Sequence, residues 1–162
     1  MAFPNCPSCS RDYVRRVRRQ GVIEKFLGFF YVYPFRCQLC GYRFRLRQPG
    51  VRYTRMDEDR REYQRIPVRF AGKLITDEKD LSATLLDLSM AGCTVAVDAA
   101  LAVGTVVGVE LQAEDQPPIS IEAAVVRSAR PGIVGLEFLR FHGNERDRLQ
   151  SLVRTLLFMP KQ

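Results

Sequence analysis

Four of the five cysteines place the strongest constraint on how this chain can fold. They form two Cys-x-x-Cys pairs, Cys6 with Cys9 and Cys37 with Cys40, and residues 10–36 lie between the pairs. Two such pairs at this spacing are typical of a tetrahedral zinc site, because each pair brings two thiolates onto one ion through a tight turn. Disulfides and a redox pair are the alternatives, but disulfides suit an exported chain and a redox pair occurs once, on a thioredoxin-like pattern. We therefore expect structural Zn²⁺ held by all four cysteines, with no coordination position open to a substrate.

The segment that contains these cysteines is expected to need the metal in order to fold. A segment of about 45 residues rarely buries enough apolar surface to fold alone, whereas structural zinc contributes on the order of 10–16 kcal/mol in small peptides. The stretch PFRCQLCGYRF (residues 34–44) resembles the second cysteine turn of a group of bacterial zinc ribbons, and the resemblance covers about residues 4–47. It implies a small N-terminal zinc ribbon and says little about function.

The positive charge of the chain is concentrated in the same segment. The whole chain has a formal net charge of +7. Residues 1–50 contain ten Lys and Arg but only two acidic residues, whereas the remaining residues contain 15 basic and 16 acidic side chains. This asymmetry predicts two domains with different partners.

Aromatic side chains accompany this basic charge. The basic residues are Arg15, Arg16, Arg18 and Arg19, and the aromatic ones are Phe26, Phe29, Phe30, Tyr31 and Tyr33. Three interpretations fit the pattern. The rings form the core of the ribbon or pack on the second domain; they dock on a protein or membrane surface; or they stack on nucleic acid while the arginines neutralise its phosphates.

From residue 66 onward the sequence changes to short alternating or β-branched runs. The expected strands are residues 68–75, 81–87, 93–97, 106–112, 119–128 and 133–138. Six short strands at regular spacing predict a closed or nearly closed barrel. A final helix is expected over residues 144–158, with Asn144 as its N-cap. Its apolar face is expected to cover one mouth or side of the barrel, and consists of Leu149, Leu152, Val153, Leu156 and Leu157.

Two short motifs accompany these strands. Arg61 and Arg65 form an Arg-x-x-x-Arg motif, and Asp87, Ser89 and Gly92 form an Asp-x-Ser-x-x-Gly motif. Guanidinium groups bind phosphate oxygens in pairs and stack on purines, and the Asp87 carboxylate can accept hydrogen bonds from a guanine edge. Ser89 adds a hydrogen bond, and Gly92 permits a turn or a close ligand approach. Either motif alone is usually a solvated charged face or a β-turn; together they favour binding of a phosphorylated guanine ligand.

These motifs, followed by short strands and a helix, resemble the PilZ domain, a bacterial receptor for cyclic di-GMP. The resemblance covers about residues 55–158 and includes the segments 66–68 and 135–138. It implies a mainly β fold, a six-stranded antiparallel barrel with a C-terminal α-helix. It also implies that an N-terminal arginine loop orders over the ligand. The residues that it places at cyclic di-GMP are Arg60, Arg61, Arg65, Asp87, Ser89 and Gly92.

Three domain-level segments and one function follow as expectations. The zinc ribbon is expected at residues 1–50, a linker at 51–60, and the barrel with its helix at 61–162. The expected function is a cyclic di-GMP receptor whose arginine loop switches and alters how the zinc module, or the surface between modules, engages a partner. The alternatives are a ligand-independent PilZ-like adaptor for a motility or secretion protein, and a nucleic-acid-binding regulator that uses the basic ribbon.

The sequence does not indicate an enzyme. It contains no Ser/His/Asp set, open metal site or phosphate loop; His142 is its only histidine, and Cys93 is expected to be a small core residue. No apolar run is long enough to span a bilayer, and the first residues lack the pattern of a signal peptide. We therefore expect a cytoplasmic protein that binds rather than catalyses.

Overall fold

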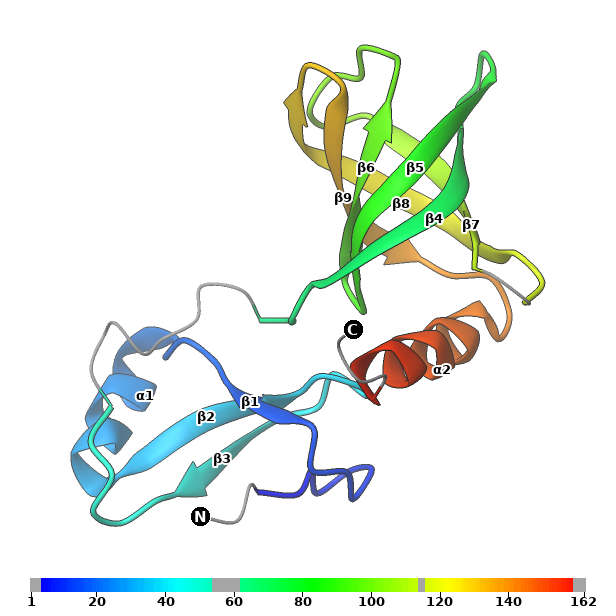
Figure 1. Cartoon of the computed structure of the whole chain (residues 1–162). Coiled ribbons are helices and arrows are strands. Elements are labelled where there is room, and N and C mark those ends of the chain that lie inside the picture. The colour runs from blue at the N-terminus through cyan, green and yellow to red at the C-terminus, as the bar shows by residue number, and fades with distance from the viewer. Residues whose placement is uncertain (1–3, 54–61, 114–115, 159–162) are drawn as a thin grey trace. The chain divides into compact units, whose positions relative to one another are not determined.

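The chain divides into two compact units. The computed structural model describes residues 4–53, 62–113 and 116–158. One unit comprises residues 1–64 and the other residues 65–162, and Figure 1 colours both along the chain. The boundary after Gln64 assigns residues 62–64 to the first unit. Among the described residues, no helix combines the length and apolarity needed to cross a membrane.

The first unit is built around a three-stranded antiparallel sheet. Strand β2 (Val32–Cys37) lies between β1 (Val14–Arg16) and β3 (Arg43–Arg47). Helix α1 (Gly21–Leu27) and the 3-10 turn η1 (Gly28–Phe30) connect β1 to β2 (Figure 1). The central strand β2 can therefore pair along both of its edges, which satisfies its backbone groups within a very small sheet.

The core of this unit is small and largely aromatic. Tyr33 and Phe35 of β2 are buried. The Tyr33 ring meets Tyr53 edge to face at 4.8 Å between centroids, and the Phe35 ring stacks on Phe44, its register partner in β3, at 6.1 Å. A core of so few rings agrees with the expectation that the module needs a further source of stability.

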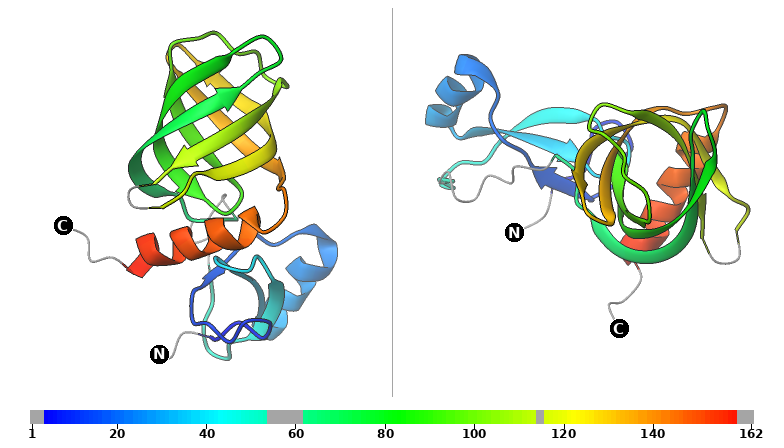
Figure 2. Two further views of the ribbon diagram at one scale, coloured as in Figure 1. Left: turned by 90° about the vertical axis from the view of Figure 1, so that its right-hand side faces the viewer. Right: turned by 90° about the horizontal axis from the view of Figure 1, so that it is seen from above.

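Six antiparallel strands close into a barrel in the second unit (Figure 2). They are β4 (Ile66–Ile75), β5 (Asp80–Ser89), β6 (Gly92–Val97), β7 (Val106–Gln112), β8 (Ile119–Arg130) and β9 (Ile133–Arg140). Their order around the barrel is β4-β5-β6-β9-β8-β7. The predicted six-stranded antiparallel barrel is confirmed, and every observed strand contains the range expected from the sequence.

The last helix covers one open end of the barrel. Helix α2 (Glu145–Phe158) lies across that end in both views of Figure 2 and contacts β8 and β4. Its buried residues are Leu149, Leu152 and Val153. The barrel interior is filled by nearly inaccessible side chains that alternate along the strands, among them Leu74, Leu85, Val95, Val109 and Leu136. The C-terminal helix is therefore confirmed in its predicted place.

Candidate ligand-binding site and metal centre

Arg65, Asp87 and Thr94 form a polar cluster on the barrel. The Arg65 Nη1 donates to the Asp87 Oδ1 at 3.1 Å and Oδ2 at 3.3 Å, and to the Thr94 Oγ1 at 2.6 Å. The Thr94 backbone N–H also donates to the Asp87 Oδ1, at 3.0 Å. The structure thus brings together the second motif arginine and the motif aspartate, and it adds a threonine that the sequence analysis missed.

Strand pairing explains why these three residues meet. Asp87 in β5 lies opposite Pro67 in β4 on one side and Thr94 in β6 on the other. The register shifts next to Asp87 in the β5–β6 pair, and again in the β4–β5 pair after Pro67. Such irregularities turn side chains away from the ordinary alternation of a strand and are frequent beside functional sites.

Bonds to a ligand can replace the bonds within this cluster at a small cost in free energy. The side chains of Arg65 and Asp87 are 32% and 26% exposed, and an ion pair in contact with water contributes only about 0–1 kcal/mol. Only Nη1 of Arg65 is bonded within the described part of the chain. The guanidinium therefore retains donors for a phosphate, and the Asp87 carboxylate retains acceptor capacity for a guanine edge.

Ser89 and Gly92 close the hairpin between β5 and β6. Ser89 is buried; its hydroxyl donates to the Gly92 carbonyl at 3.0 Å and accepts from the Ala91 backbone N–H at 3.4 Å. These bonds hold the turn that follows Asp87. The expectation that Ser89 and Gly92 contact a ligand remains a prediction.

The absence of a side chain at Gly92 has a packing reason within the barrel. A Cβ placed on this residue would lie 2.0 Å from the Leu136 carbonyl oxygen and 3.2 Å from the Glu137 Cα of β9. Two backbones approach one another at this point, and only glycine permits that distance.

We expect the Gly92→Ala substitution to destabilise the barrel by about 1–3 kcal/mol, because the added methyl overlaps a strand backbone that cannot move freely. Thermal or urea unfolding of the purified variant measures this change directly. An unfolding midpoint equal to that of the wild-type chain would contradict the close approach of β6 and β9.

The remaining predicted ligand residues, Arg60 and Arg61, lie outside the described residues. Their assignment to the ligand rests on the sequence alone. Cys93, next to Thr94, is fully buried, and burial, followed by the nearby charge of Asp87, raises the pKa of its thiol to about 12. Its expected role as a core residue is therefore confirmed, and its protonated thiol is poorly suited to act as a nucleophile.

Comparison with known proteins identifies the family of the chain. The PilZ domain family matches residues 59–155, a range that includes Arg61, Arg65 and Asp87. The chain belongs to the PilZ domain family. The matched range contains both sequence motifs and all six strands of the barrel. Comparison with curated protein sequences gives no match.

Several solved structures share the fold at low sequence identity. The PilZ domain of YcgR from Escherichia coli with c-di-GMP aligns with a TM-score of 0.52 and 18% identity, over 61% of this chain and 92% of that one. The Bacillus subtilis inhibitor of motility MotI/DgrA aligns with a TM-score of 0.54 and 17% identity, over 80% of this chain and 74% of that one. E. coli YcgR in complex with c-di-GMP aligns with a TM-score of 0.52 and 17% identity, over 89% and 73%.

The four cysteines predicted to bind zinc converge in the first unit. Their Sγ atoms all lie within 4.8 Å of one another, and both Cys6–Cys40 and Cys9–Cys37 have Sγ–Sγ distances of 3.6 Å. A disulfide requires about 2.05 Å, so these cysteines are not bonded to each other. Tetrahedral zinc, with Zn–S bonds of about 2.3 Å, places its sulfur ligands about 3.8 Å apart. The observed donor set therefore fits Zn²⁺.

Two of the four cysteines are buried, and a glycine shapes the turn beside them. Cys6 and Cys37 are almost fully buried, and burial raises the pKa of the Cys37 thiol to about 12. A bound divalent cation would reverse this tendency by deprotonating its thiol ligands outright. Gly41, directly after the second pair, has a φ of +77°, which permits the turn that directs Cys37 and Cys40 to one point. The zinc would serve as a structural cross-link, because four protein ligands fill its coordination sphere.

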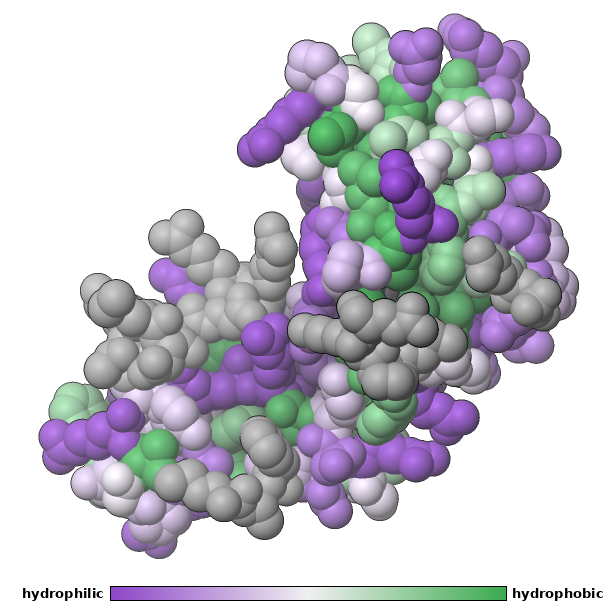
Figure 3. Space-filling view, in the orientation of Figure 1, coloured by the Kyte–Doolittle hydropathy of each residue, from purple (hydrophilic) through white to green (hydrophobic). Residues whose placement is uncertain are grey.

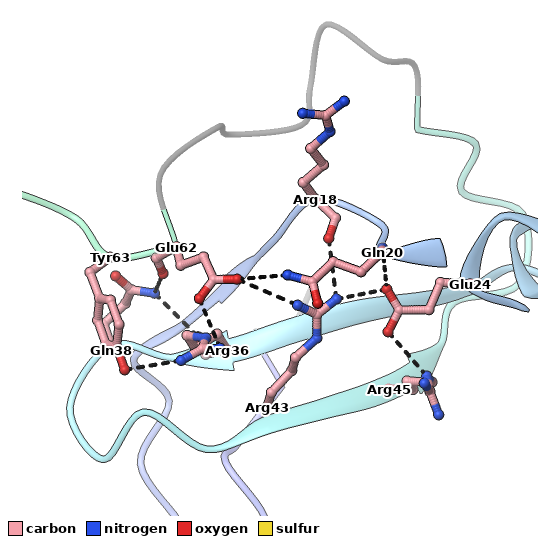
Figure 4. A network of polar contacts seen from close by, with 9 residues as sticks. All are labelled: Arg18, Gln20, Glu24, Arg36, Gln38, Arg43, Arg45, Glu62 and Tyr63. Atoms are coloured by element: carbon pink, nitrogen blue, oxygen red, sulfur yellow. Dashed lines mark hydrogen bonds and ion pairs between the residues drawn. The ribbon is translucent and has the colours of Figure 1, made fainter. Parts of the chain in front are cut away.

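Helix α1 is attached to its sheet by a carboxylate. Glu24 is buried and accepts from the Arg43 Nη2 at 2.6 Å, the Arg45 Nε at 3.3 Å and the Gln20 backbone N–H at 2.7 Å (Figure 4). The side of the helix that faces the ribbon is therefore polar, and the opposite side of α1 and η1 is apolar. We call this side the aromatic face; it comprises Val22, Ile23, Phe26, Phe29 and Phe30, each at least 56% exposed.

The aromatic face corrects the expectation that all of these rings form the core of the ribbon. Tyr33 belongs to the ribbon core as expected, but Phe26, Phe29 and Phe30 do not, because Glu24 takes the inward position on α1. Apolar and hydrophilic side chains lie together on the visible surface of this unit (Figure 3). Arg19, Lys25 and Phe29 share the lining of one shallow pocket. The exposed rings of the ribbon therefore lie beside basic side chains.

Proposed function

We propose that this protein is a receptor for cyclic di-GMP rather than an enzyme. The observation that carries the proposal is the cluster of Arg65, Asp87 and Thr94, which joins the second arginine of one motif to the aspartate of the other. It offers a guanidinium for phosphate and a carboxylate for guanine within one solvent-accessible group of side chains. The alignment with a PilZ domain of YcgR that carries c-di-GMP supports the same ligand.

The proposed roles of the site residues follow from their chemistry. Arg65 binds a phosphate or stacks on a guanine base, together with Arg60 and Arg61 from the preceding segment. Asp87 accepts from the guanine edge, and the turn held by Ser89 keeps Asp87 and Thr94 in place. Ligand binding replaces the Arg65–Asp87 pair and changes the conformation of the arginine loop, whose motif arginines close over the ligand; this is the proposed switch.

The proposed output is an altered contact between the zinc module and a protein partner. The aromatic face is apolar, and Arg19 and Lys25 lie beside Phe29. By charge complementarity, the partner surface should be apolar and acidic. The proposal places this signalling in the cytoplasm of a bacterium and retains the division into ribbon, linker and barrel at residues 1–50, 51–60 and 61–162.

Chemical-shift mapping of the zinc-loaded full chain tests where the ligand binds. Cyclic di-GMP is expected to shift the backbone amide of Thr94 strongly, because its N–H donates to the carboxylate that meets the ligand. Amides at the other end of the barrel, such as Ile133 and Val97, should move little. Shifts confined to residues outside the cluster would contradict the proposed site, and the absence of any shift would favour the ligand-independent adaptor.

A further inference from the structure

The segment between the two motif arginines is fastened to the zinc ribbon. Residues 62–64 separate Arg61 from Arg65. The Gln38 side chain holds their backbone at two points: its Nε2 donates to the Glu62 carbonyl at 3.0 Å, and its Oε1 accepts from the Gln64 backbone N–H at 2.6 Å. One amide side chain therefore pairs with the segment in the way that a neighbouring strand would.

Side chains of the same segment add further bonds to the ribbon (Figure 4). The Glu62 carboxylate pairs with the Arg36 Nη2 at 2.8 Å and the Arg43 Nη1 at 3.6 Å, and it accepts from the Gln20 Nε2 at 3.0 Å. The Tyr63 hydroxyl accepts from the Arg36 Nη1 at 3.1 Å. These bonds explain why residues 62–64 belong to the first compact unit, although they lie inside the PilZ family match.

Gln38 connects this attachment to the metal centre. It lies inside the second cysteine pair, directly after Cys37 and two residues before Cys40. Its side chain is almost fully buried, and its backbone N–H donates to the Tyr13 carbonyl at 2.9 Å. The position of the Gln38 amide is therefore fixed by the same turn that presents two of the zinc ligands.

We propose that Gln38 is a positioning residue for the cyclic di-GMP site, and that the zinc-loaded ribbon holds the segment between the motif arginines before the ligand arrives. Gln64, whose backbone N–H is bonded to Gln38, directly precedes Arg65 in the chain, so a hold on Gln64 restricts the backbone of Arg65. Ordering a chain segment costs conformational entropy, and a segment ordered in advance lowers that cost at binding. Metal binding and ligand binding are then linked reciprocally. This inference rests on the proposed function.

Two substitutions of Gln38 test the linkage. Gln38→Ala removes both backbone contacts, and Gln38→Asn keeps the amide but shortens it, which protects the experiment against a poorly folded alanine variant. Gln48→Ala is the matched control, because Gln48 belongs to the same unit and bonds Tyr53. Calorimetric titration with cyclic di-GMP is expected to show binding weakened by about fivefold or more in both Gln38 variants and unchanged in the control. Metal analysis should find zinc retained in each.

Hydrogen exchange provides a readout that does not depend on the ligand. The amide of Gln64 is expected to be protected in the zinc-loaded wild-type chain and to lose that protection in both Gln38 variants and on removal of zinc. Unchanged protection in the variants would overturn the attachment. Unchanged or tighter cyclic di-GMP binding by the variants would overturn its role in positioning the site. If the wild-type chain binds no cyclic di-GMP, the proposed function and this positioning role both fail, while hydrogen exchange still decides whether the attachment exists.

Discussion

Replacing Cys37 with serine is expected to abolish stable zinc binding and to unfold the N-terminal unit while the barrel remains folded. Cys37 is completely buried and its Sγ lies 3.6 Å from that of Cys9 within the four-cysteine cluster. Structural zinc contributes on the order of 10–16 kcal/mol in small peptides. The few buried rings of this unit, such as Tyr33 and Phe35, offer no comparable source of stability.

Metal analysis and two-dimensional NMR of the purified Cys37→Ser variant measure this result. We expect one zinc per wild-type chain and none in the variant, with loss of amide dispersion confined to the first unit. Cys93→Ser is the matched control, because Cys93 lies in the barrel outside the cysteine cluster; that variant should lose some barrel stability but retain its zinc. A Cys37→Ser chain that keeps both zinc and a folded ribbon would contradict the assignment of the metal site.

Replacing Arg65 with alanine is expected to weaken cyclic di-GMP binding by about 10- to 150-fold. Loss of a hydrogen bond to a charged group costs about 1.5–3 kcal/mol, which corresponds to that range of affinity. The barrel itself should lose little stability, because the Arg65–Asp87 pair is partly exposed. The variant therefore separates ligand recognition from folding.

Fluorescence anisotropy with a labelled cyclic di-GMP gives this affinity, and thermal unfolding without ligand checks the fold. Arg130→Ala serves as the control of equal charge, because Arg130 is exposed at the end of β8, away from the cluster of Arg65 and Asp87. We expect the control to bind as the wild-type chain does. Equal losses in both arginine variants would show that general positive charge, and not the cluster, attracts the ligand.

The barrel could be predicted because the alternation of apolar residues along each strand matches the side chains that the barrel buries. Alternating residues such as Leu85 and Val95 point into the interior, and the strands differ from their predicted ranges only at their ends. Thr94 could not be identified in the same way. It follows a cysteine in an ordinary strand, and its contact with Arg65 arises from cross-strand register and a bulge, which the sequence does not reveal.

The ribbon shows a second reason for incomplete prediction. Phe26 and Phe29 are large apolar residues of the kind that usually fill a core, yet both are exposed. On α1, the buried position is taken by Glu24 instead of Phe26. Glu24 accepts hydrogen bonds from Arg43 and Arg45, which belong to β3 and are separated from α1 in the sequence by the whole of β2. The attachment of residues 62–64 to Gln38 is non-local in the same sense. Local patterns specify regular elements, whereas long-range pairs of polar groups decide which face of an element is buried.

The most direct test of the account is a calorimetric titration of the zinc-loaded full chain with cyclic di-GMP. We predict saturable binding with a defined stoichiometry, and no comparable heat from GMP, which cannot bring two guanine bases and two bridging phosphates to the site at once. A folded, zinc-loaded chain that gives no saturable heat with cyclic di-GMP would contradict the receptor function and leave the PilZ barrel as an adaptor.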